Sequence, residues 1–160
     1  MREFDRELDE KFMREAIRLA SLAVEHGNEP FGAVLVKDGK IAFESENRIY
    51  TMRDRTYHAE LGLLRDFFAQ TDVEELSEYT LYSSLEPCFM CSGALVWAKL
   101  GRLVYGASDR DLADILSTRG SDCVNTVFDA YESAPLVTAG VLREESLVPV
   151  RTYFQTHKKN

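Results

Sequence analysis

Apolar residues recur at helical spacing from Asp9 to Gly27. Positions near i, i+4, i+8, i+11 and i+12 share one stripe of a helix. Here these positions hold Phe12, Ala16, Ala20, Ala23 and Val24. Asp9 suits an N-cap and Gly27 suits a C-cap. We therefore expect an amphipathic helix over this stretch.

Two short apolar runs follow, Ala33 to Val36 and Ile41 to Glu44, and they flank Lys37-Asp38-Gly39-Lys40. An Asp-Gly pair between such runs is a strong signal for a tight hairpin turn. The pattern predicts two antiparallel strands. Residues 47–55 are polar and irregular, and they lead the chain into its next regular element.

The middle of the chain alternates between helix and strand patterns. Tyr57 to Phe68 predicts a helix with Leu61, Leu64 and Phe68 on one face. Tyr79 to Ser83 is short and rich in aromatic residues, which is typical of a strand.

A third helix is expected to begin at Glu86-Pro87, because proline suits the first turn of a helix, and to run to about Lys99. Leu103 to Gly106 predicts the next strand, and Asp111 to Leu116 predicts a short helix. Residues 117–135 are polar and are expected to form a loop.

The chain ends with two further elements. Leu136-Val137-Thr138 predicts the last strand, and Glu144 to His157 predicts a helix. Pro149 falls inside that helix, and a proline in a helix interior removes a hydrogen bond and clashes with the preceding turn. We expect Pro149 to kink the helix or to restart it.

The order helix, strand, strand, helix, strand, helix, strand implies parallel crossovers beside an antiparallel hairpin. We expect a mixed sheet between helical layers. The chain has 160 residues, of which 45% are hydrophobic, and this suits a single domain spanning residues 1–160. No window approaches ~18 consecutive apolar residues, so no membrane-spanning helix is expected.

The net charge is −8, and the basic residues are scattered apart from Arg53 with Arg55 and the final Lys158-Lys159. Proteins that act on polyanions usually carry a basic patch. The charge therefore argues against a nucleic-acid substrate, although one local basic rim could exist within an acidic chain. The first residues lack the apolar segment of a secretory signal.

Three cysteines are an odd number, and Cys123 is expected to be a free thiol. This usage suits a reducing cytoplasm better than a disulfide framework. His26 and His157 are expected at the surface. Trp97 is expected in the core or in a dimer interface.

The chemistry of the chain is concentrated in His58-Ala59-Glu60 and in Pro87-Cys88-Phe89-Met90-Cys91. One imidazole and two thiolates are three ligands for tetrahedral zinc, and they leave the fourth position open, as in catalytic sites. Cys88 and Cys91 are three residues apart at a helix start, so both sulfurs face the same way. The helix N-terminus also lowers thiol pKa.

Glu60 is placed to move protons beside a zinc ion that it does not itself bind. Zinc lowers the pKa of a bound water to ~7, and one carboxylate can then act as base and as acid in turn. A lone Cys-x-x-Cys more often marks a structural zinc half-site or a redox pair. A structural zinc module would have no task for Glu60.

The two segments together form the H-x-E…P-C-x-x-C signature of zinc deaminases that act on nucleobases. The chain resembles the cytidine deaminase superfamily, and within it the branch of bacterial guanine deaminases and tRNA adenosine deaminases. Residues 30–34 (P-F-G-A-V) are similar to the guanine deaminases, and Asn47-Arg48 to the tRNA enzymes. Residues 102–107 match a strand of both branches.

The resemblance implies a three-layer α/β/α cytidine deaminase-like fold with a mixed five-stranded sheet, a zinc cofactor and a homodimer. It also implies substrate contacts by Asn47 and by the Ala59 backbone. Glu86 matches the T-x-E-P-C stretch, with Ser84 in place of Thr, and could orient the site. Three further candidates complete the site. Phe31 could stack on a flat ring, and Phe154 could close over the ligand. One of Asp109, Asp111 and Asp114 could be the acidic residue near the base.

We therefore expect a zinc-dependent hydrolytic deaminase of a nucleobase or nucleoside. The stretch Pro30-Phe31-Gly32-Ala33 favours a guanine-like purine. The alternatives are a tRNA adenosine deaminase, supported by Asn47-Arg48, a cytosine-type deaminase, and a non-catalytic structural zinc module.

Overall fold

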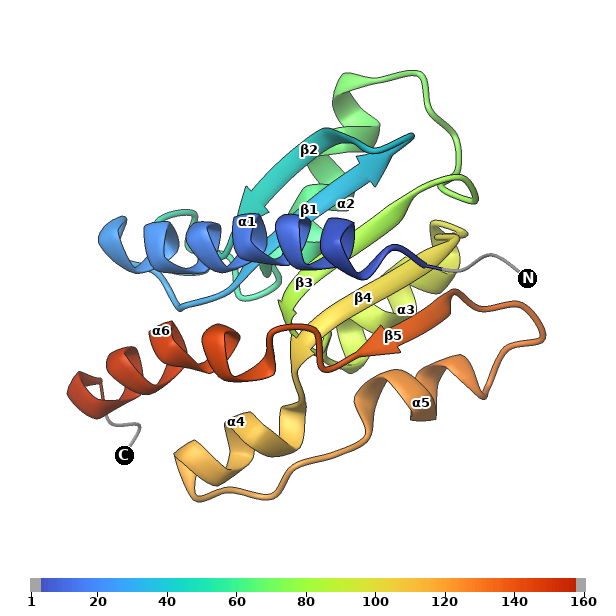
Figure 1. Cartoon of the computed structure of the whole chain (residues 1–160). Helices are drawn as coiled ribbons and strands as arrows, with labels where there is room; N and C mark the ends of the chain where they lie inside the picture. The colour runs from blue at the N-terminus through green and yellow to red at the C-terminus, as the bar shows by residue number, and fades with distance from the viewer. Residues whose placement is uncertain (1–3, 158–160) are drawn as a thin grey trace.

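The computed structural model describes residues 4–157, so Lys158-Lys159 lie outside the described residues. Within them a five-stranded sheet has the order β2-β1-β3-β4-β5 (Figure 1). β1 (Gly32–Lys37) pairs antiparallel with β2 (Lys40–Glu46) and with β3 (Thr80–Leu85). β4 (Arg102–Ala107) runs parallel to β3 and to β5 (Leu136–Ala139). The expected mixed sheet is confirmed.

The alternation of side chains along the strands divides the core into two layers. Leu35, Leu81 and Leu103 face the side covered by α2 (Ala59–Gln70), α3 (Phe89–Trp97) and α5 (Cys123–Phe128). Val34, Tyr82 and Val104 face α1 (Arg6–Glu25) on the other side. α6 (Arg143–Thr156) lies below α1 in Figure 1 and contacts both α1 and β4. The helix–sheet–helix architecture is therefore the expected one.

The hairpin turn and the first helix agree with the sequence pattern, except at one cap. Asp38 and Gly39 both have positive φ, 51° and 72°, as a two-residue turn of this kind requires. The N-cap of α1 is Asp5, whose carboxylate accepts hydrogen bonds from the N–H groups of Glu7 and Leu8. Asp9 as N-cap is therefore wrong. It lies inside the helix, buried, and it binds Arg102 and Tyr82 across the core.

α2 begins two residues later than expected and turns a different face to the sheet. Its buried apolar side chains include Leu63, Leu64 and Phe67, while Leu61 and Phe68 are only partly buried. The expected face is therefore wrong at Leu61 and Phe68. The buried stripe contains positions 60, 63, 64 and 67, because this helix must direct Glu60 inward together with its apolar residues.

The last third of the chain holds one element that the sequence pattern did not predict. α4 (Asp109–Leu116) and β5 are found where they are expected. The loop expected over residues 117–135 contains α5, whose Val124 and Phe128 pack into the core. α6 continues through Pro149, so a restarted helix is wrong there. Burial of Leu147 and Val150 on either side of Pro149 stabilises the helix against the missing hydrogen bond.

Within residues 4–157, no helix is both long enough and apolar enough to cross a membrane.

Candidate active site

The two segments that carry the zinc signature meet where α2 and α3 begin. His58 is the N-cap residue of α2, and Cys88 is the N-cap residue of α3. Neither side chain makes a capping hydrogen bond to its own helix, so both remain available for a ligand. Cys91 follows one turn later and is fully buried. The N-termini of α2 and α3 thus bring His58 and Cys88, which are 30 positions apart in sequence, close together.

The donor atoms of these three residues have the spacing of a tetrahedral zinc site. The Nδ1 atom of His58 lies 3.6 Å from the Sγ atom of Cys88 and 3.6 Å from the Sγ atom of Cys91. Zinc with ligand distances of about 2.3 Å to sulfur and about 2.05 Å to nitrogen places tetrahedral ligands about 3.6 Å apart. The residues therefore fit zinc. No further His, Cys, Asp or Glu of residues 4–157 joins this group.

The electrostatics of the group favour metal binding. The hydrogen bond from Cys91 and the neighbouring His58 imidazole lower the pKa of Cys88 to about 4, against the opposing effect of burial. Cys88 in turn raises the pKa of His58 and, with burial, that of Cys91. A thiolate is thus available at Cys88 at neutral pH, and thiolate is the form that zinc binds.

Glu60 lies in the first turn of α2 and is only 5% exposed. Burial, together with the nearby charge of Cys88, raises the pKa of this carboxyl group. The Oγ atom of Ser83 lies 2.9 Å from the Oε1 atom of Glu60 and 2.6 Å from the carbonyl oxygen of Leu85. Ser83 thereby fixes the Glu60 side chain beside the metal ligands. A carboxyl group held there can accept and release a proton beside the metal ligands.

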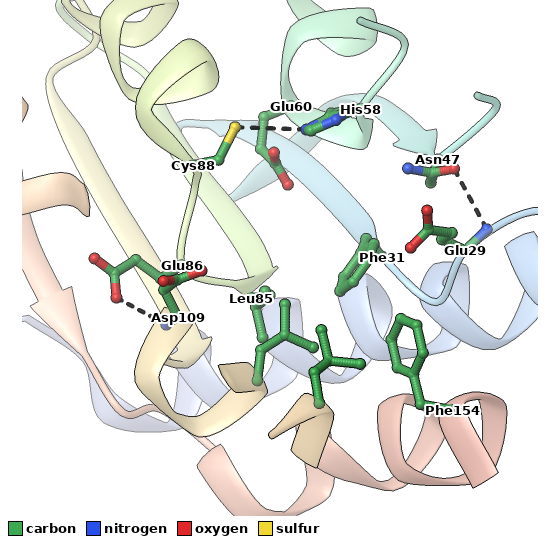
Figure 2. Close-up of a pocket in the computed structure, with 12 residues that line it drawn as sticks. Glu29, Phe31, Asn47, His58, Glu60, Leu85, Glu86, Cys88, Asp109 and Phe154 are labelled. Atoms are coloured by element: carbon green, nitrogen blue, oxygen red, sulfur yellow. Dashed lines mark hydrogen bonds between the residues drawn. The ribbon is translucent and has the colours of Figure 1, made fainter. Parts of the chain in front are cut away.

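A cavity of about 200 Å³ opens next to His58 and Glu60 (Figure 2). Its apolar walls come from Phe31, from the end of β3, from α4 and from α6, whereas its polar groups gather on opposite sides. The lining residues are Glu29, Phe31, Asn47, His58, Glu60, Leu85, Glu86, Cys88, Asp109, Leu112, Leu116 and Phe154. A flat ring between apolar walls with polar groups at its edges is the ligand that such a cavity suits.

Several expected substrate contacts lie at this cavity, namely Phe31, Asn47, Glu86, Asp109 and Phe154. The Oδ1 atom of Asn47 accepts hydrogen bonds from the N–H groups of Glu29 and Ile49, at 3.4 and 3.2 Å. Both bonds use the carbonyl oxygen, and no described residue binds the amide nitrogen, which leaves it for a ligand. Ala59 is fully buried between His58 and Glu60.

Glu86 holds the wall of the cavity together. Its Oε1 atom accepts a hydrogen bond from the N–H group of Asp109, and its Oε2 atom accepts one from the N–H group of Val124, both at 3.0 Å. One carboxylate thus joins the end of β3 to the starts of α4 and α5. The orienting role expected for Glu86 stays a prediction.

Asp111 and Asp114 do not line the cavity, so the structure does not place them as substrate contacts. Asp111 accepts a hydrogen bond from the Ser108 N–H group in a capping box and forms an ion pair with Arg143 at 2.6 Å. Asp114 is exposed. Both face away because α4 turns Leu112 and Leu116, rather than its acidic residues, toward the cavity.

Other sequence-based expectations have mixed outcomes. Cys123 is a free, buried thiol, and His26 and His157 lie at the surface, as expected. Trp97 is 80% exposed, so packing in the core is wrong, whereas a place in a dimer interface stays a prediction.

The sequence argument missed four lining residues: Glu29, Leu85, Leu112 and Leu116. Glu29 could have been found because it directly precedes Pro30-Phe31, which the family resemblance had already singled out. Leu112 and Leu116 are four residues apart on α4, which places them on one helix face. Their spacing indicated a shared face, but not which cavity that face lines.

Comparison with known proteins gives relatives of two kinds. A tRNA-specific adenosine deaminase of Haemophilus influenzae is 40% identical over 156 residues, covering 96% of this chain and 87% of the relative. A guanine deaminase of Bacillus subtilis is 41% identical over 106 residues, covering 66% of this chain and 68% of the relative. A solved structure from work on A-to-I editing by tRNA:A34 deaminases superimposes with a TM-score of 0.73 and 33% identity. The superposition covers 87% of this chain and 98% of the chain in that structure.

The sequence model of the cytidine and deoxycytidylate deaminase zinc-binding region matches residues 6–107, which include all three donor residues and Glu60. That match covers more than half of the chain and agrees with the geometry of the site. The chain therefore belongs to the cytidine and deoxycytidylate deaminase family, as a deaminase with zinc as its cofactor.

Proposed function

We propose that this protein hydrolyses the exocyclic amine of an adenosine in tRNA and produces inosine and ammonia. The observation that carries the proposal is the match to a tRNA-specific adenosine deaminase over nearly the whole chain. That match includes the last third, which supplies Leu112, Leu116 and Phe154 to the cavity. This reverses the order of substrates that the sequence alone favoured, in which a guanine-like purine came first.

The residues of the site can be given distinct tasks in this reaction. Zinc held by His58, Cys88 and Cys91 supplies a Lewis acid that makes hydroxide available near neutral pH. Glu60 accepts the proton of the attacking water and delivers a proton to a ring nitrogen. It next takes the proton of the hydroxyl group formed on the ring carbon and passes it to the departing amine, which leaves as ammonia. Water and adenosine are thereby converted to inosine and ammonia, with Glu60 returned to its starting state.

The cavity supports the binding of a flat purine ring. Phe31 and Phe154 lie near each other in Figure 2 and provide aromatic surface on the same part of the cavity wall. The free amide nitrogen of Asn47 can donate a hydrogen bond to an acceptor on the base or the sugar. The burial of Glu60 and the apolar walls surround the polar groups with a medium of low dielectric constant, which strengthens polar contacts there.

An acidic chain can still bind RNA if its basic residues lie next to the site. The loop between Asn47 and His58 carries Arg48, Arg53 and Arg55, all of them exposed. Both ends of this loop are site residues. We propose that its arginines form a local basic rim that contacts the phosphates on either side of a target nucleotide.

The test is incubation of the zinc-loaded protein with a tRNA anticodon stem-loop that contains adenosine, followed by mass spectrometry of the nucleosides. Inosine is expected, together with stoichiometric ammonia. Arg53→Glu is expected to reduce turnover of the stem-loop and to lower the slope of its salt dependence by about one. Deamination of free bases should be unaffected by this change, because a free base has no phosphate.

Lys40→Glu is the matched control for charge reversal. Lys40 begins β2, whereas Asn47 follows the end of that strand, about 20 Å away at ~3.3 Å per residue. This variant is expected to process the stem-loop like the wild type. Equal losses in both variants would attribute the effect to net charge and not to the loop beside the site.

Guanine is the second candidate substrate. It is favoured by the relative from Bacillus subtilis and by the Pro30-Phe31-Gly32-Ala33 stretch, whose Phe31 lines the cavity. The same ammonia assay with guanine, cytosine and their nucleosides decides the matter. Release of ammonia from guanine, with no inosine in the stem-loop, would reject the tRNA proposal and establish the second candidate.

A single domain over residues 1–160, a cytoplasmic location and a homodimer stay predictions. Light scattering of the purified protein tests the last of these, and a dimer that Trp97→Ser weakens would place the exposed Trp97 in the interface.

A further inference from the structure

Glu29 is a buried carboxylate that the mechanism described above does not use. It lines the cavity and is only 8% exposed. Among residues 4–157, no group donates a hydrogen bond to its carboxylate and no side chain forms an ion pair with it. Asn47 contacts only the backbone N–H group of Glu29, and the charge of Glu29 acts on His58 and Tyr153 without a hydrogen bond. It is also absent from the group of metal donor atoms. A charge buried without a partner is costly for the fold.

The other buried carboxylates of the described residues all have partners. Glu46 binds His26, Glu60 binds Ser83, and Glu86 binds two backbone N–H groups. Asp9 is paired with Arg102. Glu29 is therefore the exception among the carboxylates that this fold buries. Its oxygen atoms are not sealed in the protein interior, so a ligand in the cavity can reach them.

The position of Glu29 is held firmly by its backbone. Its N–H group donates to the Oδ1 atom of Asn47, and its carbonyl oxygen accepts a hydrogen bond of 2.9 Å from the Phe31 N–H group. Pro30 lies between and restricts the backbone further. Figure 2 shows the Glu29 carboxylate beside Asn47 and directed toward the cavity. The same wall thus presents a fixed acceptor next to the free amide donor of Asn47.

We propose that Glu29 is a specificity-determining residue that accepts a hydrogen bond from an N–H or O–H donor on the purine substrate. The inference rests on the proposed deamination of a purine. Two parts of such a substrate carry this donor: a hydroxyl group of the ribose and the ring N–H of a free base. Phosphate is excluded from this position because it is an anion and accepts hydrogen bonds.

The experiment measures binding, so it does not depend on turnover. Calorimetry with zinc-loaded protein compares three ligands that have no amine to lose. Purine riboside carries ribose hydroxyls, purine carries a ring N–H, and 9-methylpurine carries neither. Glu29→Gln keeps the shape of the side chain and removes its charge. Glu25→Gln is the matched control, because Glu25 is exposed at the end of α1, outside the cavity.

Glu29→Gln is expected to weaken binding about 10- to 100-fold for the ligand that carries the donor, the size expected for a hydrogen bond to a charged group. Binding of 9-methylpurine and the behaviour of Glu25→Gln should remain within twofold of the wild type. A selective loss for purine riboside assigns the ribose, and a selective loss for purine assigns the ring N–H.

Two results would overturn the inference. Equal losses for all three ligands would make Glu29 a structural residue, and no loss for any of them would remove it from recognition. Failure of the proposed function gives a different result, in which the wild type binds none of the three purines.

Discussion

Replacement of Asp111 by Asn tests whether this residue holds the fold or contacts the substrate. In the structure it caps α4 through Ser108 and pairs with Arg143 of α6, while its side chain stays outside the cavity. The family resemblance had offered it as a substrate contact. We expect Asp111→Asn to lower stability and to leave the rate of deamination within twofold of the wild type.

The magnitude follows from the charge environment. The hydrogen bonds from Arg143, followed by those from the Ser108 backbone and side chain, lower the pKa of Asp111 from 3.8 to about 2, against the effect of burial. This difference corresponds to an upper limit of about 2.4 kcal/mol. The Arg143 side chain is 50% exposed, so solvent screens the pair, and about 1–1.5 kcal/mol is the expected loss. For a chain of this length the melting temperature should fall by about 2–5 °C.

The assay is urea unfolding of both proteins as a function of pH. Because folding lowers the pKa of Asp111, its stabilisation is present above pH ~4 and is lost as the pH falls toward ~2. The difference between wild type and variant should therefore be constant from pH 5 to 7 and should shrink below pH 4. A tenfold loss of kcat/KM with unchanged stability would refute the reasoning and return Asp111 to the substrate site.

Two further changes test other parts of the account. Glu60→Gln should fold and retain zinc, since Ser83 can donate a hydrogen bond to the new amide oxygen. Its kcat should fall by at least about 10⁴-fold, because the proton transfers by Glu60 are lost. Ammonia release measures this rate, and near-normal turnover would remove Glu60 from the mechanism. Gly32→Ala should destabilise the protein by about 1–3 kcal/mol, because the Cβ atom of the new alanine would lie 2.2 Å from the backbone oxygen of Ala16 in α1. A denaturation midpoint equal to that of the wild type would contradict this close approach.

The sequence predicted the elements whose signals are local. The Asp38-Gly39 turn, the alternation of helix and strand, and the positions of His58, Cys88 and Cys91 at helix starts all follow from neighbouring residues. The zinc site was predictable for the same reason, since its ligands come from two short motifs. The spacing within each motif already indicates which way the side chains point.

The errors arose where distant residues decide the outcome. Asp9 has the composition of a helix cap, but Arg102 binds it from β4, more than 90 residues away in sequence. α5 is too short for a clear periodic pattern, and Glu86 fixes its start by accepting the Val124 N–H group. Pro149 is tolerated in α6 because the neighbouring apolar side chains are buried. Such tertiary contacts are not visible in a local pattern.

The predicted substrate contacts, which stay predictions, fall between these cases. Phe31, Asn47 and Phe154 reach the cavity as the family resemblance implied, whereas the resemblance could not choose among Asp109, Asp111 and Asp114. That choice depends on which face α4 turns inward. The helix directs its leucines to the cavity, so only its first residue, Asp109, reaches the cavity wall.

X-ray absorption at the zinc edge of the purified protein tests the central claim most directly. The account predicts one zinc per chain with two sulfur donors at about 2.3 Å and two nitrogen or oxygen donors at about 2.0–2.1 Å. Cys88→Ser should reduce the sulfur donors to one or release the metal. A third sulfur or a second imidazole around the wild-type zinc would close its coordination and contradict a catalytic site built from His58, Cys88 and Cys91.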